Sequence, residues 1–376
     1  MSVAGRSSAE KVLDRRALNR ALLARQHLLR RADLDVAAAL DRLIALQAQS
    51  AKAPYFALWS RLKAFAPSDL SDRLEDFSVA RGTLMRGTLH VAAADDFAAI
   101  RPLIQQGLDR FLTDGSVYGR ALAGLEPAEI GAVARDQLER SPLTAAELRD
   151  ALAARWPGRD PQALAMAARI HLPMLQLPPR GLWGRSSQPT LATMAGRIAT
   201  PRPGLDLQEL VRRYLAAFGP ASVADAQTWL GLTRLAPIFD ALRPSLAIFR
   251  GEDGIELFDL PGAERPPGDT EAPVRFLGEF DNVLLAHDDR TRIMSADHRR
   301  RLYTPNGILR AAVLIDGVTA GLWRIEDGKT ASVLHIELFD KVAKPVTRAL
   351  AEEGERLLAF GAKHAGGEVR IEAARN

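Results

Sequence analysis

The chain has 376 residues, 47% hydrophobic and 26% charged, which is enough for two or three units with apolar cores. It contains no cysteine and no apolar run of 18 residues, which excludes disulfides, thiolate chemistry and a membrane-spanning helix. The net charge is only +4, but 43 of the 50 basic residues are arginines. A GC-rich genome explains that bias, and contact with phosphates is the functional alternative. Without the apolar block of a secretory signal at its start, the chain is expected to be cytoplasmic.

The first part of the chain predicts helices followed by a hairpin. Residues 10–78 carry apolar residues at three- and four-residue spacing, with a helix expected to start at Ser68 or Asp69 as its N-cap. Residues 81–93 change to a strand-like pattern with glycine breaks and predict a short hairpin. Residues 95–112 return to a helical pattern. Helices followed by a hairpin is the order of elements in a winged helix.

An internal repeat follows, with copies at residues 141–152 and 219–230. Each copy comes after an amphipathic helix and has Pro, then Ser or Thr, Ala and an acidic residue in the same places. We therefore expect helix, turn and capped helix twice, which is the front half of a helix-turn-helix. Two unrelated capped helices are the alternative. The capping-box spacing occurs in both copies: Thr144 with Glu147, and Ser222 with Asp225.

The rest of the chain predicts a second hairpin and a mixed C-terminal region. Residues 235–260 read as a helix and a hairpin, and residues 261–272 as a Pro/Gly linker. Residues 311–338 alternate like a meander, and a closing helix and a short strand at 368–373 follow. We predict a mainly helical α+β fold of tandem winged-helix (helix-turn-helix) units with a C-terminal α/β portion. The expected boundaries are 1–115, 116–200, 201–262 and 273–376.

Motifs for metals and nucleotides do not occur in the sequence. The seven histidines show no metal-ligand spacing, and there is neither a P-loop nor a nucleophile elbow. We therefore expect no metal and no cofactor.

Two glutamines, Gln47 and Gln49, end the helical pattern before a proline. Residues two apart on a helix point about 200° apart, so these side chains converge only if the helix ends between them. A carboxamide orients water and carries partial negative charge, but it does not titrate and is no general base. Such a pair would suffice where the leaving group is already activated, as in a purine alkylated at N7 or N3. Surface or capping glutamines are the alternative that spacing alone favours.

The ordered series of motifs resembles the winged-helix DNA glycosylases of the AlkZ and YcaQ type, over roughly residues 12–362. The stretch "LQAQ" is similar to the catalytic Gln–apolar–Gln motif of that family, and "HLP" at 171–173 to a His–apolar–Pro motif that contacts DNA. "FGPASVADAQTWLGL", "EFDNVLLAHDDR" and "GLWRIE" resemble further family segments. Ala48 is small for the position between the glutamines. YcaQ-type members have Asp where this chain has Gln49, which places it nearer AlkZ, whose relatives act on bulky adducts and crosslinks and often protect antibiotic producers.

The resemblance implies a monofunctional DNA glycosylase that acts as a monomer on double-stranded DNA in the nucleoid and has no membrane partner. A non-catalytic winged-helix DNA-binding protein, either a regulator or a lesion-binding resistance factor, is the alternative. A Schiff-base step from Lys52 is not favoured. For each candidate DNA contact a structural or solvated role is the competing interpretation. The expected catalytic residues are Gln47 and Gln49, and the expected DNA contacts are His171, Pro173, Arg81, Arg86, Arg180 and Arg185.

Overall fold

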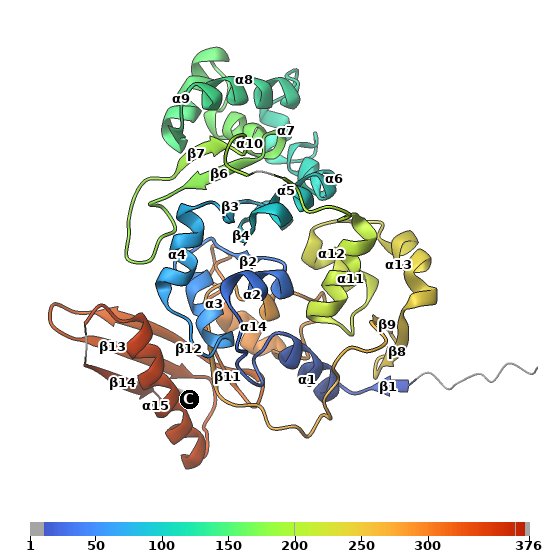
Figure 1. Ribbon diagram of the computed structural model, residues 1–376, viewed down its shortest axis with the longest axis vertical. Coiled ribbons are helices and arrows are strands. Elements are labelled where there is room, and N and C mark those ends of the chain that lie inside the picture. Colours follow the sequence, from blue (N-terminus) through green and yellow to red (C-terminus); the bar gives the residue numbers. More distant parts are fainter. Residues whose placement is uncertain (1–10, 199, 365, 373–376) are drawn as a thin grey trace, which may run out of the picture.

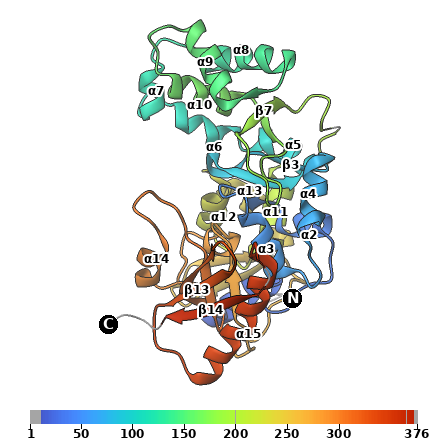
Figure 2. The same ribbon diagram turned by 90° about the vertical axis from the view of Figure 1, so that its left-hand side faces the viewer.

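The computed structural model describes residues 11–198, 200–364 and 366–372. They form a body and a lobe, made by residues 117–193, that stands beyond one end of the body (Figures 1 and 2). Helices and sheets contribute to both parts, in agreement with the expected mixture of helices and strands. None of the described helices is long and apolar enough to cross a bilayer.

Helices surround a central hairpin in the first part of the body. The helix expected to be capped by Ser68 or Asp69 begins earlier, at Pro67, with Ala66 as its N-cap. Proline suits the first helical position because its missing N–H would have no partner there. Asp69 is the third residue of this helix and accepts the Ala66 N–H at 2.8 Å. The helices are α1 (Arg15–Arg25), α2 (Val36–Leu43), α3 (Ala53–Arg61), α4 (Pro67–Glu75), α5 (Ala94–Leu103) and α6 (Gln105–Asp109).

A six-stranded antiparallel sheet joins the body to the lobe. The hairpin predicted at 81–93 is present, but it is buried at the middle of this sheet and is not an exposed wing. One residue pair, Gly82 with Leu175, links the strands of this sheet that lie in the body to those that lie in the lobe. The sheet therefore crosses the expected boundary at residue 115. The strand order is β2 (Leu46–Gln47), β4 (Leu89–Ala93), β3 (Val79–Thr83), β6 (Met174–Leu177), β7 (Thr190–Thr193) and β5 (Leu143–Thr144).

Both copies of the internal repeat begin a helix with a capping box, as predicted. Thr144 Oγ1 accepts the Glu147 N–H at 3.2 Å, and the Glu147 carboxylate accepts the Thr144 N–H at 2.7 Å. Ser222 and Asp225 make the same reciprocal bonds at 3.1 and 2.8 Å. The helices around them are α7 (Val117–Ala121), α8 (Pro127–Arg140), α9 (Ala145–Arg155), α10 (Pro161–His171), α11 (Leu207–Phe218), α12 (Val223–Leu230) and α13 (Ala236–Leu242).

A three-stranded sheet follows the second copy. The predicted hairpin forms β8 (Ala247–Gly251) and β9 (Glu256–Asp259). The third strand, β1 (Lys11–Leu13), comes from the other end of the chain and pairs parallel with β8. Sequence analysis did not predict this strand, because three residues are too few to show a period.

The C-terminal region is a five-stranded sheet with a long helix packed against it (Figure 1). Its antiparallel meander agrees with the prediction for residues 311–338, while the last strand pairs parallel with its neighbour. The final residue of the predicted strand 368–373 lies outside the described residues. The elements are β10 (Arg275–Leu277), α14 (Ala296–Leu302), β11 (Ala312–Ile315), β12 (Val318–Asp327), β13 (Ser332–Leu338), α15 (Lys344–Gly361) and β14 (Gly367–Glu372).

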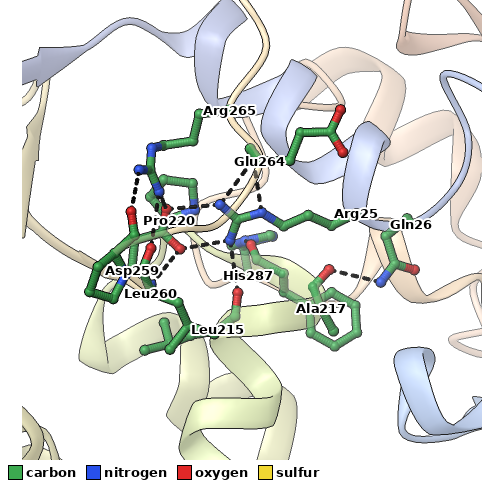
Figure 3. A network of polar contacts seen from close by, with 12 residues as sticks. Arg25, Gln26, Leu215, Ala217, Pro220, Asp259, Leu260, Glu264, Arg265 and His287 are labelled. Carbon is green, nitrogen blue, oxygen red and sulfur yellow. Dashed lines mark hydrogen bonds and ion pairs between the residues drawn. The ribbon is translucent and has the colours of Figure 1, made fainter. Parts of the chain in front are cut away.

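Two buried ion pairs, which we call the ion-pair joint, tie α1 and α3 to much later segments. Arg25 binds both carboxylate oxygens of Asp259 at 2.7 and 2.8 Å and also donates to the Leu215 carbonyl (Figure 3). Arg61 binds both oxygens of Asp281 at 2.7 and 2.8 Å. All four side chains are at most 4% exposed. Bidentate geometry of this kind compensates the desolvation of both charges.

Candidate active site

Gln47 lies on a strand and Gln49 in the bend that follows it, so neither is at a helix end. Helix α2 stops at Leu43, Ile44 takes a left-handed φ of 69°, and β2 pairs Gln47 with His90. The helix predicted to run as far as Gln47 is therefore wrong. A short apolar run such as residues 43–46 fits a helix or a strand equally well, and here it is fully buried while the chain passes from the end of α2 into β2.

Both carboxamides converge on residues 86–89. The Gln47 oxygen accepts a hydrogen bond from Arg86 Nη2 at 3.0 Å, and the Gln49 oxygen accepts the Leu89 N–H at 3.1 Å. Gln47 is 6% exposed, whereas Gln49 is exposed. Within the described residues, neither amide nitrogen donates a hydrogen bond to the protein. The site therefore fixes both oxygens and leaves both N–H₂ groups available.

Arg86 connects this pair to the rest of the site. It sits in a short 3₁₀ turn, η1 (Met85–Gly87), with a left-handed φ of 58°, a conformation that is uncommon for residues other than glycine. It donates to the Trp229 carbonyl and to Gln47. Among the described residues it has no carboxylate partner. Burial, reinforced by the charge of Arg290, lowers the pKa of Arg86 to about 10.

His90 is neutral at physiological pH. It is 1% exposed, and burial together with the Arg86 charge lowers its pKa to about 3. Nδ1 lies 3.0 Å from the Thr88 carbonyl and so carries the hydrogen, which leaves the Nε2 lone pair facing Arg86 Nη2 at 3.5 Å. Amides, a neutral imidazole and a guanidinium make up the centre, and none of them gains or loses a proton near pH 7.

Arg81 does not occupy an exposed wing, and its expected contact with DNA is not offered by this structure. The side chain is 3% exposed, and Nη2 donates at 2.8 Å to the carbonyl of Ala48, the residue between the two glutamines. Its Nη1 is buried without a partner in the described residues. Burial lowers the pKa of Arg81 to about 10, and the charge of Arg180 adds to this effect. Arg81 therefore holds the backbone of the glutamine pair.

The other expected DNA contacts lie on the lobe. His171 ends α10 and is half-buried, with the Ile170 carbonyl before it held by buried Arg101. Pro173 is half-buried as well. Arg185 is the exposed guanidinium of the set, and half-buried Arg180 donates to a carbonyl of its own loop at 3.1 Å.

Sequence reasoning missed a cavity beside Arg86. It measures about 520 Å³ and opens between α6 and α12. Two of the motifs quoted above, "ADAQTWL" and "AHDDR", supply part of its wall, but nothing in them indicates a cavity. Side chains around it include Arg86, Arg110, Phe111, Gln227, Thr228 and Asp288.

Metal chemistry finds no support in the described part of the chain. No group of three or more His, Asp or Glu side chains there could hold a metal ion.

Comparisons with known proteins agree with one another. The model of the family described as DNA glycosylase AlkZ-like matches residues 40–360. The interstrand DNA cross-link repair glycosylase of Streptomyces sahachiroi is 27% identical over 169 residues, covering 40% of this chain and 44% of that protein. The aligned part thus spans less than half of that relative. The solved structure of Streptomyces sahachiroi DNA glycosylase AlkZ has a TM-score of 0.77 at 21% identity and covers 96% of this chain and all of that one.

Proposed function

Because the chain belongs to the AlkZ-like DNA glycosylase family, we propose that it hydrolyses the N-glycosidic bond of purines alkylated at N7 or N3 in duplex DNA. The observation that carries this proposal is the pair of carboxamides anchored on residues 86–89 without a titrating base bonded to them. An alkylated purine is a cation and leaves without protonation. The site then has to hold a water and stabilise an oxocarbenium-like sugar.

The two glutamines divide this work. Gln47 is held by Arg86, and its oxygen keeps a second lone pair for the sugar cation or the attacking water. Gln49 is exposed and offers its N–H₂ group to that water. Unmodified purines need a proton to leave, and no acid here supplies it, so they stay intact. The products are a free base and an abasic site.

Duplex binding is assigned to the three predicted units, 1–115, 116–200 and 201–262, as tandem winged helices, with 273–376 as the C-terminal region. His171, Pro173, Arg180 and Arg185 are the proposed contacts on the lobe, and Arg86 the one beside the glutamines. The protein would act as a monomer on the nucleoid in the cytoplasm. Bulky adducts and crosslinks fall within the proposed range, as the name of the curated relative indicates for that protein.

Base release from a duplex that carries 7-methylguanine tests this function. Free base detected by mass spectrometry should fall by about 10²–10³ in Gln47→Ala or Gln49→Ala, the loss typical when one preorganised polar group is removed. Gln162→Ala, an exposed glutamine on α10, is the matched control and should keep the wild-type rate. Tight, salt-sensitive DNA binding without release of base would instead identify a non-catalytic DNA-binding protein.

A further inference from the structure

The connection between β6 and β7, residues 178–189, runs from the lobe back to the body, and we call it the lobe loop. Figure 1 shows it beside α4. Its Leu182 is 8% exposed and belongs to the same apolar cluster as Ala48, the residue between the two glutamines. The lobe loop also carries Arg180 and Arg185, two of the proposed DNA contacts. One segment therefore connects the proposed duplex-binding surface with the surroundings of the glutamines.

A series of hydrogen bonds fastens the lobe loop to α3 and α4. The Trp183 N–H donates to Ser71 Oγ at 3.3 Å, and the Ser71 hydroxyl lies 2.9 Å from the hydroxyl of Tyr55. The Tyr55 hydroxyl donates to the Gly181 carbonyl at 2.8 Å, and its side chain is buried at 1% exposure. The Trp183 ring packs 5.1 Å from the Tyr55 ring and 5.2 Å from the Phe360 ring, between centroids. This part of the loop is thus fixed against the helix that follows the glutamines.

Gly181 lies directly against Arg81. It has a left-handed φ of 100°, and a Cβ there would lie 2.9 Å from Arg81 Cδ and 3.3 Å from Nε. Only glycine permits both this conformation and this approach. Arg81 in turn donates to the Ala48 carbonyl at 2.8 Å. Because the Arg81 side chain is only 3% exposed, it has little room to move away from the loop.

We propose that Gly181 and Tyr55 are positioning residues for base release: they fix the lobe loop against Arg81, and Arg81 fixes the backbone between Gln47 and Gln49. The inference rests on the proposed function and adds the elements that set the geometry of the two carboxamides. Neither residue touches the reacting atoms. A displacement of about 1 Å in that backbone would move both carboxamides, and a misplacement of this size costs on the order of 10²-fold in rate.

The test compares Gly181→Ala with Gly184→Ala. Single-turnover release of 7-methylguanine from duplex DNA, with enzyme in excess, should slow about tenfold to hundredfold in Gly181→Ala, because the new Cβ displaces Arg81. Affinity for the unmodified duplex, measured by fluorescence anisotropy, should stay unchanged. Gly184 is the matched control, because it lies in the same loop with a left-handed φ of 69° and a Cβ there would meet no described atom within 4 Å. Gly184→Ala should release base at the wild-type rate.

A double-mutant cycle tests whether the effect passes through Arg81. In the Arg81→Met background the guanidinium is already absent, so adding Gly181→Ala should slow base release by less than about twofold. Independent losses that multiply would overturn the proposed path. A role in packing alone would lower the free energy of unfolding and leave the rate constant of the folded enzyme unchanged, which would also overturn the proposal.

Tyr55→Phe provides a second variant that decides the matter if Gly181→Ala does not fold. It keeps the ring and removes the hydrogen bond to the Gly181 carbonyl, and base release should slow about threefold to tenfold. Tyr214→Phe is its control, because it removes another buried hydroxyl that donates to a carbonyl at 2.8 Å.

The failure of this inference and the failure of the proposed function give different results. If the wild type releases base and the variants at Gly181 and Tyr55 release it as fast as their controls, the positioning proposal is wrong and the glycosylase assignment stands. If the wild type releases no base, the proposed function fails and takes this inference with it.

Discussion

Buried arginines occur in several regions of the molecule, and two of these regions, the ion-pair joint and the glutamine site, treat the buried charge differently. In the ion-pair joint, Arg25 and Arg61 each face a carboxylate that is 0% exposed, so each buried guanidinium has a counter-charge. Around the glutamines, Arg81 and Arg86 have only carbonyl, amide and imidazole acceptors among the described residues. Burial without a counter-charge lowers the pKa of both to about 10.

The difference separates a structural use of charge from a functional one. A paired buried charge contributes to holding distant segments together, but it presents no field to the outside. An uncompensated cation is unfavourable in the free protein and becomes favourable when an anion such as a phosphodiester arrives. Under the proposed function, the site would thus be prepared for DNA at some expense of stability, while the joint stabilises the fold.

Removing a carboxylate from the joint should have the largest effect on stability. Asp259→Ala leaves Arg25 buried without a counter-charge, and we expect the free energy of unfolding to fall by about 3–5 kcal/mol. Chemical denaturation monitored by circular dichroism measures this free energy of unfolding. Asp297→Ala breaks the solvent-exposed pair with Arg300 and should change it by less than about 1 kcal/mol. If the two substitutions lowered the free energy of unfolding equally, the distinction between a buried ion pair and a solvent-exposed one would be wrong.

Removing a cation from the site should affect activity more than stability. Arg81→Met keeps the side-chain volume but leaves the Ala48 carbonyl without its donor, which costs about 1–3 kcal/mol. Release of 7-methylguanine should fall at least about tenfold, because the backbone between the glutamines is no longer held. The rate of base release and the free energy of unfolding are measured on the same sample, by kinetics and by chemical denaturation. A stability loss as large as that of Asp259→Ala, with base release unchanged, would contradict this account.

A smaller effect appears with pH, and both regions contribute to it. His90 in the site and His287 beside the joint have pKa values lowered from 6.5 to about 3, chiefly by burial. Between these values the unfolded chain binds protons that the folded chain excludes, so stability present above pH 6.5 is lost as the pH falls. Denaturation at about pH 7 and about pH 5 should show this loss. The loss of stability between these two pH values should be smaller in His90→Gln than in the wild type. It should be unchanged in His364→Gln, because the ring of His364 is partly exposed.

Local signals explain which parts of the fold were predictable. The capping boxes at Thr144 and Ser222 each depend on four consecutive residues, and the C-terminal meander on its alternation, so both were found. The glutamine segment was assigned to a helix because the three- and four-residue apolar spacing before it continues through residues 43–46. The partners of Arg25 and Arg61 lie 234 and 220 residues away, a distance over which one sequence carries no signal.

The candidate site was predictable only in part for the same reason. Gln47 and Gln49 stood out by residue type and resemblance, whereas their anchoring on residues 86–89 depends on strand pairing. Arg81 was expected to contact DNA because residues 81–93 were interpreted as the hairpin of a winged helix, and the sequence does not show that this hairpin is buried inside a larger sheet. Asp288 lies in a quoted motif, but its place beside Arg86 depends on segments about 200 residues apart.

The parallel pairing of β1 with β8 has a consequence for the order in which the protein assembles on the ribosome. Lys11–Leu13 are made early, yet their partner strand follows more than 230 residues later, and so does the carboxylate that Arg25 requires. At about 5–20 residues per second the nascent chain waits roughly 10–50 s for them. Until then the first helix lacks both the strand that pairs with the residues before it and the carboxylate that neutralises Arg25.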